Sequence, residues 1–139
     1  MRKLLTTIFA TILFAISISA QTIENSSRST IGYISSSGTV ENSSRSTLGY
    51  IKSDGTVEDS SRKTLGYIKS NGTVENASRS TIGYINSNGT IENGSRLTLG
   101  YVNSNGTVEN SSRSTIGYAK GVTREHAAAF FFFFFMPKS

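Results

Sequence analysis

Residues 39–55 read TVENSSRSTLGYIKSDG, and the same seventeen-residue unit recurs without gaps in six copies between residues 22 and 123. Seven positions hold one residue type in every copy, namely Thr, Glu, Ser, Arg, Thr, Gly and Tyr. Such strict periodicity is typical of repeat proteins, in which each unit completes its core by packing on its neighbours. The unit therefore has to be interpreted before any isolated motif.

Each unit carries two short runs of β-branched and aromatic residues, such as TVE at 39–41 and TLGYI at 47–51. Clusters of Ser, Asn, Asp and Gly separate these runs, which is a strand and turn pattern. The Ser-Asn-Gly and Ser-Asp-Gly segments predict three-residue hairpin loops that close on a left-handed glycine. Five such loops end at Gly38, Gly55, Gly72, Gly89 and Gly106.

The loop length sets the register of the strands. In the second unit a three-residue loop pairs Lys52 with Thr56, Ile51 with Val57 and Tyr50 with Glu58. Gly49, Ile51 and Val57 then share one apolar face, and we expect Leu48 on the opposite face with Tyr50. A two-residue loop would shift the pairing by one residue and mix the two faces, so we favour the longer loop. Gly49 and its equivalents would let a bulky group approach the sheet.

A lone strand remains at each end of the repeat, at residues 22–25 and 114–119. Pairing these two strands would close a ring and remove both exposed edges. The sequence therefore predicts an all-β fold, a closed ring or barrel of ten to twelve short strands built from β-hairpin repeats. Five loops fit a five-fold ring and six units fit a six-fold ring, so both closures stay open.

After Lys120 the pattern changes to a run that contains six consecutive phenylalanines at 130–135. Thr123 can cap a helix, Glu125 suits its first turn, and Pro137 would stop it. We expect residues 124–136 to form a helix that is apolar on every side and lies inside or caps the ring. The alternatives are a Phe-rich strand or an anchor to a membrane or partner.

The first twenty residues have a basic start, an apolar run from Leu4 to about Ile18, and small residues up to Ala20. This pattern predicts a cleaved secretory signal peptide at residues 1–20, the alternative being a retained membrane anchor. The repeat domain then spans 21–123, the helix 124–136 and a short tail 137–139. Without Arg2 and Lys3, twelve basic residues face nine acidic ones, and this weak excess does not predict nucleic-acid binding.

The recurring Gly-Tyr-Ile, Asn-Gly loop and Thr-Val-Glu-Asn segments resemble those of bacterial beta-flower proteins, in particular the five-fold group. The leader and the terminal AAAFFFFFF at 127–135 resemble that group as well. The resemblance covers residue 22 to about 136. It implies short hairpin repeats around a central axis and an exported location in the periplasm, at the cell surface or outside the cell, and it implies no catalytic residues.

No catalytic, cofactor-binding or metal-binding residue is predicted. The chain has no cysteine and a single histidine, His126, which we interpret as a helix-end residue. Six glutamates recur once per unit, so a ring would separate them rather than pair two of them, and we expect each to face solvent near an arginine. They are Glu24, Glu41, Glu58, Glu75, Glu92 and Glu109.

Arginine and tyrosine also recur once per unit. The arginines are Arg28, Arg45, Arg62, Arg79, Arg96 and Arg113, and the tyrosines are Tyr33, Tyr50, Tyr67, Tyr84, Tyr101 and Tyr118. We expect the arginines to close turns and the tyrosines to pack on the outer face, the alternative being repeated sugar-binding sites. The sequence thus predicts a non-enzymatic exported repeat protein with a structural or interaction role, without a cofactor. A glycan or cell-surface component is the partner considered, and the alternatives are a multivalent carbohydrate-binding module and a fibre-forming surface protein.

Overall fold

A computed structural model of the chain describes residues 20–136, so the predicted leader and tail lie almost wholly outside the described residues. Twelve short strands and one C-terminal helix make up this part. The strands are β1 (Gln21–Asn25), β2 (Thr30–Ile34), β3 (Thr39–Asn42), β4 (Thr47–Ile51), β5 (Thr56–Asp59), β6 (Thr64–Ile68), β7 (Thr73–Asn76), β8 (Thr81–Ile85), β9 (Thr90–Asn93), β10 (Thr98–Val102), β11 (Thr107–Asn110) and β12 (Thr115–Tyr118). The helix consists of α1 (Arg124–Ala128) followed by a π-helical turn, η1 (Ala129–Phe133).

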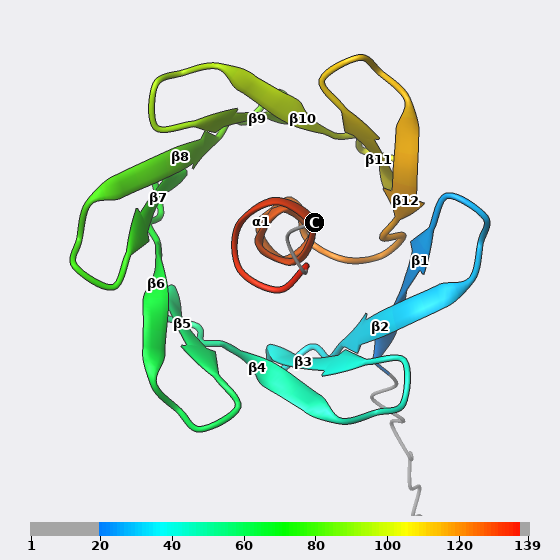
Figure 1. Cartoon of the computed structure of the whole chain (residues 1–139), viewed down its shortest axis with the longest axis horizontal. Helices are drawn as coiled ribbons and strands as arrows, with labels where there is room; N and C mark the ends of the chain where they lie inside the picture. The colour runs from blue at the N-terminus through cyan, green and yellow to red at the C-terminus, as the bar shows by residue number, and fades with distance from the viewer. Residues whose placement is uncertain (1–19, 137–139) are drawn as a thin grey trace, which may run out of the picture.

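The strands form one closed antiparallel barrel in which each strand pairs with its neighbours in the sequence (Figure 1). The barrel closes where β1 pairs with β12, through Glu24 opposite Tyr118 and Asn25 opposite Gly117. The predicted closure is therefore confirmed, and the number of strands is twelve. Six seventeen-residue units surround the axis, which decides between the two closures that the sequence left open.

Both ends of the barrel carry three-residue loops. At one end Lys52 N–H donates to Thr56 O and Gly55 N–H donates to Lys52 O, as the loop predicted from Asp54 and Gly55 requires. At the other end the Ser-Ser-Arg segments, which read Ala-Ser-Arg at 77–79 and Gly-Ser-Arg at 94–96, make the same loop, with Arg45 N–H donating to Asn42 O. The third loop residue is left-handed in both, with φ near +92° at Gly55 and +70° at Arg45.

The predicted register is confirmed for the hairpins that close on glycine, but one face assignment is wrong. Ile51 lies opposite Val57 and Tyr50 opposite Glu58. On the other side of β4 the pairing passes from Gly49 opposite Val40 to Thr47 opposite Glu41, which leaves Leu48 as a β-bulge. A bulge breaks the two-residue alternation of side chains, and Leu48 packs against the buried core instead of joining Tyr50 outside.

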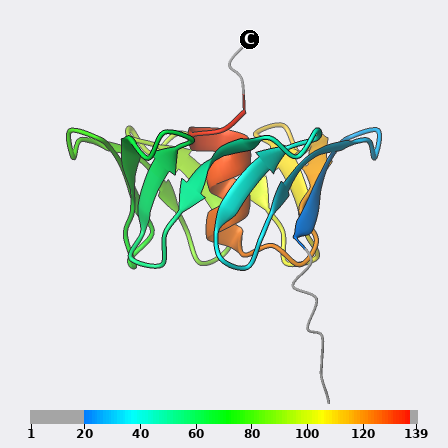
Figure 2. The same ribbon diagram turned by 90° about the horizontal axis from the view of Figure 1, so that it is seen from below.

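The helix lies on the axis of the barrel (Figure 2), and the core consists of side chains from the strands and from this helix. The helix starts at the end of the barrel that carries the glycine loops and runs to the end that carries the Ser-Ser-Arg loops, whose tips splay outward. Since an eight-stranded barrel already fills its interior with side chains, twelve strands leave room for this helix. The buried hydrophobic residues of the barrel are Ile23, Ile34, Val40, Ile51, Val57, Ile68, Val74, Ile85, Ile91, Val102 and Val108 in the strands, with Ala119 directly after β12.

Each phenylalanine of the run packs on the glycine of a different unit. A Cβ added to any of these glycines would lie within 3.0 Å of one phenylalanine ring. Phe130 faces Gly32, and Phe131 to Phe135 face Gly117, Gly100, Gly83, Gly66 and Gly49 in turn. The predicted close approach at these glycines is confirmed, and six aromatic rings contact six units in one circuit of the barrel.

This matching explains why the helix is shorter than predicted. Consecutive side chains of an α-helix are turned by about 100° around its axis, whereas neighbours in a ring of six lie about 60° apart. A wider helix has more residues per turn, which reduces the angle between consecutive side chains. The helix widens here, because Phe134 N–H donates to Ala129 O at 2.9 Å, a π-helical hydrogen bond. Phe134 then leaves helical geometry at φ −127°, so the helix ends at Phe133 and not at residue 136.

The burial of the phenylalanines predicts a graded effect of truncation. Phe130 is only 2% exposed, whereas Phe135, at the end of the run, is partly exposed. We expect Phe130→Ala to lower the free energy of unfolding by about 3 to 5 kcal/mol and Phe135→Ala to lower it less. Urea unfolding of the two variants tests this order. Equal losses, or no loss for Phe130→Ala, would contradict a core organised around the helix.

Candidate functional site

The outer wall of the barrel carries a three-residue contact that recurs in every unit, which we call the Arg clasp. In each unit Nη1 of the arginine lies 2.9 to 3.1 Å from Oε1 of the glutamate four residues earlier. The same guanidinium lies over the tyrosine ring of the preceding unit, 3.5 to 3.6 Å from its centroid. Arg45, for example, joins Glu41 of its own unit to Tyr33 of the unit before.

The Arg clasps link the units into a ring. Arg28 of the first unit stacks on Tyr118 of the sixth, so the contact also crosses the seam where β1 meets β12. Cross-strand pairing brings the partners together, since each such tyrosine lies opposite the glutamate on the next strand, as Tyr33 lies opposite Glu41. The expected positions of arginine in the turns and of tyrosine on the outer face are therefore confirmed.

Arginine occupies a backbone conformation that glycine would adopt at lower cost. All six arginines have φ between 69° and 71°, a region that disfavours residues with a Cβ. At the opposite end of the barrel glycine is required in the same loop position, because a Cβ at Gly38 would collide with the carbonyl oxygen of Ile51. At the other end arginine occupies this loop position, and its side chain makes the contacts of the Arg clasp despite the unfavourable backbone conformation.

The glutamates differ in their exposure. Glu58 and Glu75 are only 8% exposed, so the expectation that each glutamate faces solvent is wrong for these two. Each is covered by its arginine and by a lysine, with Lys52 Nζ 3.7 Å from Glu58 and Lys69 Nζ 3.7 Å from Glu75. At Glu92 a hydrogen bond from Arg96, assisted by Asn86, lowers the pKa of the carboxyl group below its ordinary value.

The tips of the Ser-Ser-Arg loops form a rim, which we call the serine rim. The asparagine or aspartate before each loop accepts two backbone hydrogen bonds, as Asn42 Oδ1 does from Ser44 N–H at 2.9 Å and Ser46 N–H at 3.0 Å. These bonds hold the loop in one shape and leave its serines exposed. Because the same bonds recur in all six units, the rim presents nearly identical tips around the axis.

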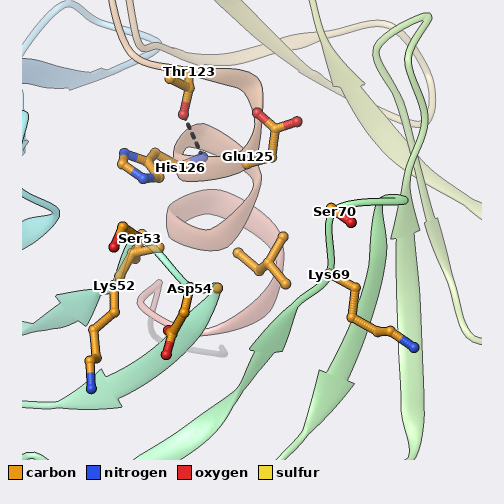
Figure 3. Close-up of a pocket in the computed structure, with 11 residues that line it drawn as sticks. Lys52, Ser53, Asp54, Lys69, Ser70, Thr123, Glu125 and His126 are labelled. Atoms are coloured by element: carbon orange, nitrogen blue, oxygen red, sulfur yellow. Dashed lines mark hydrogen bonds between the residues drawn. The ribbon is translucent and has the colours of Figure 1, made fainter.

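At the opposite end a pocket of about 330 Å³ lies between the start of the helix and the loops of two neighbouring hairpins (Figure 3). Ser53 and Asp54 come from one loop, Ser70 from the next, and His126 from the first turn of α1. Thr123 caps the helix as predicted, because its Oγ1 accepts a hydrogen bond from His126 N–H at 3.2 Å. A backbone hydrogen bond from Thr56 lowers the pKa of Asp54.

His126 is the helix-end residue that the sequence indicated. Burial at the mouth of the barrel lowers the pKa of its imidazole below the ordinary 6.5, and the neighbouring Glu125 opposes this shift. Within residues 20–136 no group of three His, Asp or Glu side chains is arranged to hold a metal ion. In the same part of the chain, no helix is long and apolar enough to cross a bilayer.

A comparison with protein families then assigns the fold. A family model described as 5-fold beta-flower protein matches residues 20–135. The chain belongs to this beta-flower family. No curated protein and no solved structure matches it. The family description is five-fold, whereas this beta-flower closes with six units, so the repeat number differs within one architecture.

Two features of this beta-flower were not predicted from its sequence. The Ser-Ser-Arg loops were not recognised as hairpins with a left-handed third residue, although their three-residue spacing equals that of the glycine loops. The pairing of six phenylalanines with six glycines was also missed. A signal for it was present, since the number of consecutive phenylalanines equals the number of repeats.

The Arg clasp predicts an unusual order of stability at Arg62. Arg62→Gly loses the contacts with Glu58 and Tyr50 but relieves the backbone, whereas Arg62→Ala loses the contacts and keeps the strain. We expect the alanine variant to be less stable than the glycine variant by about 1 kcal/mol, and the wild type to be the most stable. Chemical unfolding measures the order, with Lys63→Ala as the near-neutral control. An alanine variant as stable as the glycine variant would show that no strain is present.

Burial of His126 predicts a pH-dependent stability. Because the folded pKa lies below 6.5, the unfolded chain takes up the proton first as the pH falls. The contribution to stability is complete above about pH 6.5 and declines as the pH falls through the interval down to the folded pKa. In thermal melts between pH 4.5 and 7.5, His126→Gln should flatten this part of the profile. An unchanged profile would show that His126 is not the group responsible.

Proposed function

We propose that this beta-flower is a non-enzymatic exported protein that works as a rigid scaffold, presenting the serine rim to a component of the cell surface. The observation that carries the proposal is the repetition of nearly identical, exposed and internally hydrogen-bonded tips around one axis. Weak contacts repeated on a rigid frame gain avidity without any single strong site. The basic and apolar start of the sequence supports export.

The Arg clasps favour this proposal over a carbohydrate module built on bare tyrosine platforms. Sugar stacking needs an open aromatic face, and one face of each tyrosine is covered by a guanidinium. A glycan remains a partner that the rim serines could bind by hydrogen bonds. The fibre alternative receives no support, because all twelve strands of the described barrel have partners on both sides and leave no edge for a further strand.

Graded substitution of the rim tests the proposal. Ser26, Ser60 and Ser111 are replaced by glutamate singly, in pairs and together, and binding of the fluorescent protein to isolated cell envelopes is measured. If several tips act together, binding should fall more steeply than in proportion to the number of tips changed. Mass analysis of the exported chain, which should begin at Gln21, tests the leader in the same preparation.

The opposite end of the barrel supplies the matched control. Ser53, Ser70 and Ser87 are exposed residues of the glycine loops, and their replacement by glutamate adds the same charge to the same barrel. These variants should bind as the wild type does. If substitutions at both ends weakened binding equally, the added net charge would explain the loss of binding. Absence of binding to any envelope fraction would contradict the scaffold function.

A further inference from the structure

The run of phenylalanines breaks the six-fold repetition at one place. Phe130 and Phe135 are the first and last of the run, yet they face Gly32 and Gly49, which belong to neighbouring units. A helical chain rises along its axis as it turns. After one circuit Phe135 therefore lies farther along the axis than Phe130. We call this difference in height between Phe130 and Phe135, at the boundary of the first and second units, the step.

A pocket of about 360 Å³ lies at this step. Phe130 and Phe135 line it together with Ile31, Leu48 and Met136. Phe130 and these two aliphatic residues belong to the core or pack on it, whereas Met136 is 38% exposed at the rim. The step thus leaves an apolar floor with an opening at the end of the barrel that carries the Ser-Ser-Arg loops.

Polar groups stand on one side of the opening. Asn42 and Ser43 come from the neighbouring Ser-Ser-Arg loop. Asn42 Oδ1 already accepts two backbone hydrogen bonds, so Asn42 offers a ligand its amide nitrogen, a donor, and Ser43 offers a hydroxyl that donates one hydrogen bond and can also accept. An apolar pocket with a few polar groups at its edge is the usual form of a small-molecule site.

We propose that this step pocket binds one small aromatic molecule per chain, preferentially one that carries a hydrogen-bond acceptor. Two aromatic rings and a thioether favour an aromatic guest over an aliphatic one, through ring edges and sulfur contacts. The volume exceeds that of cavities of roughly 150 Å³ that take up benzene. The step occurs once in the circuit, so the stoichiometry is one ligand per ring, in contrast to the six-fold contacts of the serine rim.

Methyl NMR of Met136 tests the proposal on the folded protein. The other methionine of the chain is Met1, so Met136→Leu assigns the signal. Toluene and acetophenone are titrated against the ¹³C-methyl-labelled protein. Both should shift the signal saturably with one-site behaviour, and acetophenone should bind more tightly. Absence of a saturable shift, or binding to several sites, would overturn the proposal.

Two tip variants locate the site. Ser43→Trp should fill the opening and weaken binding by about tenfold or more. Ser111→Trp places the same side chain at the equivalent position of the sixth unit and should leave binding unchanged. Leu48→Phe, with Leu65→Phe as its counterpart in the next unit, provides a second pair in case a tryptophan disturbs the fold. Equal effects within both pairs would overturn the assignment to the step.

The end of the chain supplies the last comparison. A protein that ends at Met136 should bind the two probes with the same affinity as the full chain. Binding that appears only after this truncation would identify residues 137–139 as the occupant of the pocket and would contradict a free small-molecule site.

Discussion

The contact between phenylalanine rings and glycine backbones is the constraint on which this barrel depends. A ring of twelve strands is too wide to fill its interior with its own side chains, so it requires a central element. The glycine in each unit lets an aromatic ring lie directly against the sheet, where any Cβ would collide. Barrel and helix are therefore complementary parts of one core, and each would expose a large apolar surface without the other.

The same constraint shapes the helix. Because six units surround the axis, consecutive phenylalanine side chains must be separated by a smaller angle around the axis than in an α-helix. The backbone therefore changes from α1 to the wider π-helical turn η1 and leaves helical geometry at Phe134. The number of repeats and the conformation of the C-terminal segment are linked in this way. A helical path around a flat ring does not close on itself, and the step pocket lies where Phe130 and Phe135, the two ends of this path, meet neighbouring units.

On the outer surface of the barrel the Arg clasp also joins neighbouring units. It places a guanidinium between the glutamate of one unit and the tyrosine of another, so that neighbouring units are joined on their solvent side as well as through the core. Exposed ion pairs contribute little one at a time, but here a stacked tyrosine ring adds to each pair, and burial of the carboxylate strengthens the pairs at Glu58 and Glu75. The left-handed backbone at arginine shows that side-chain contacts outweigh local conformational preference at this position.

Local sequence determined much of this protein. The seventeen-residue period, the glycine loops with the register that follows from them, the apolar inner face and the capped, apolar helix all depend on residues close together in the chain, and the pairing of the end strands followed from their unpaired edges. Tertiary structure decided the closure with six units, the bulge at Leu48, the burial of Glu58 and Glu75 and the end of the helix at Phe133. These features depend on contacts between residues far apart in the sequence, and their geometry exists only once the barrel has closed around the phenylalanines.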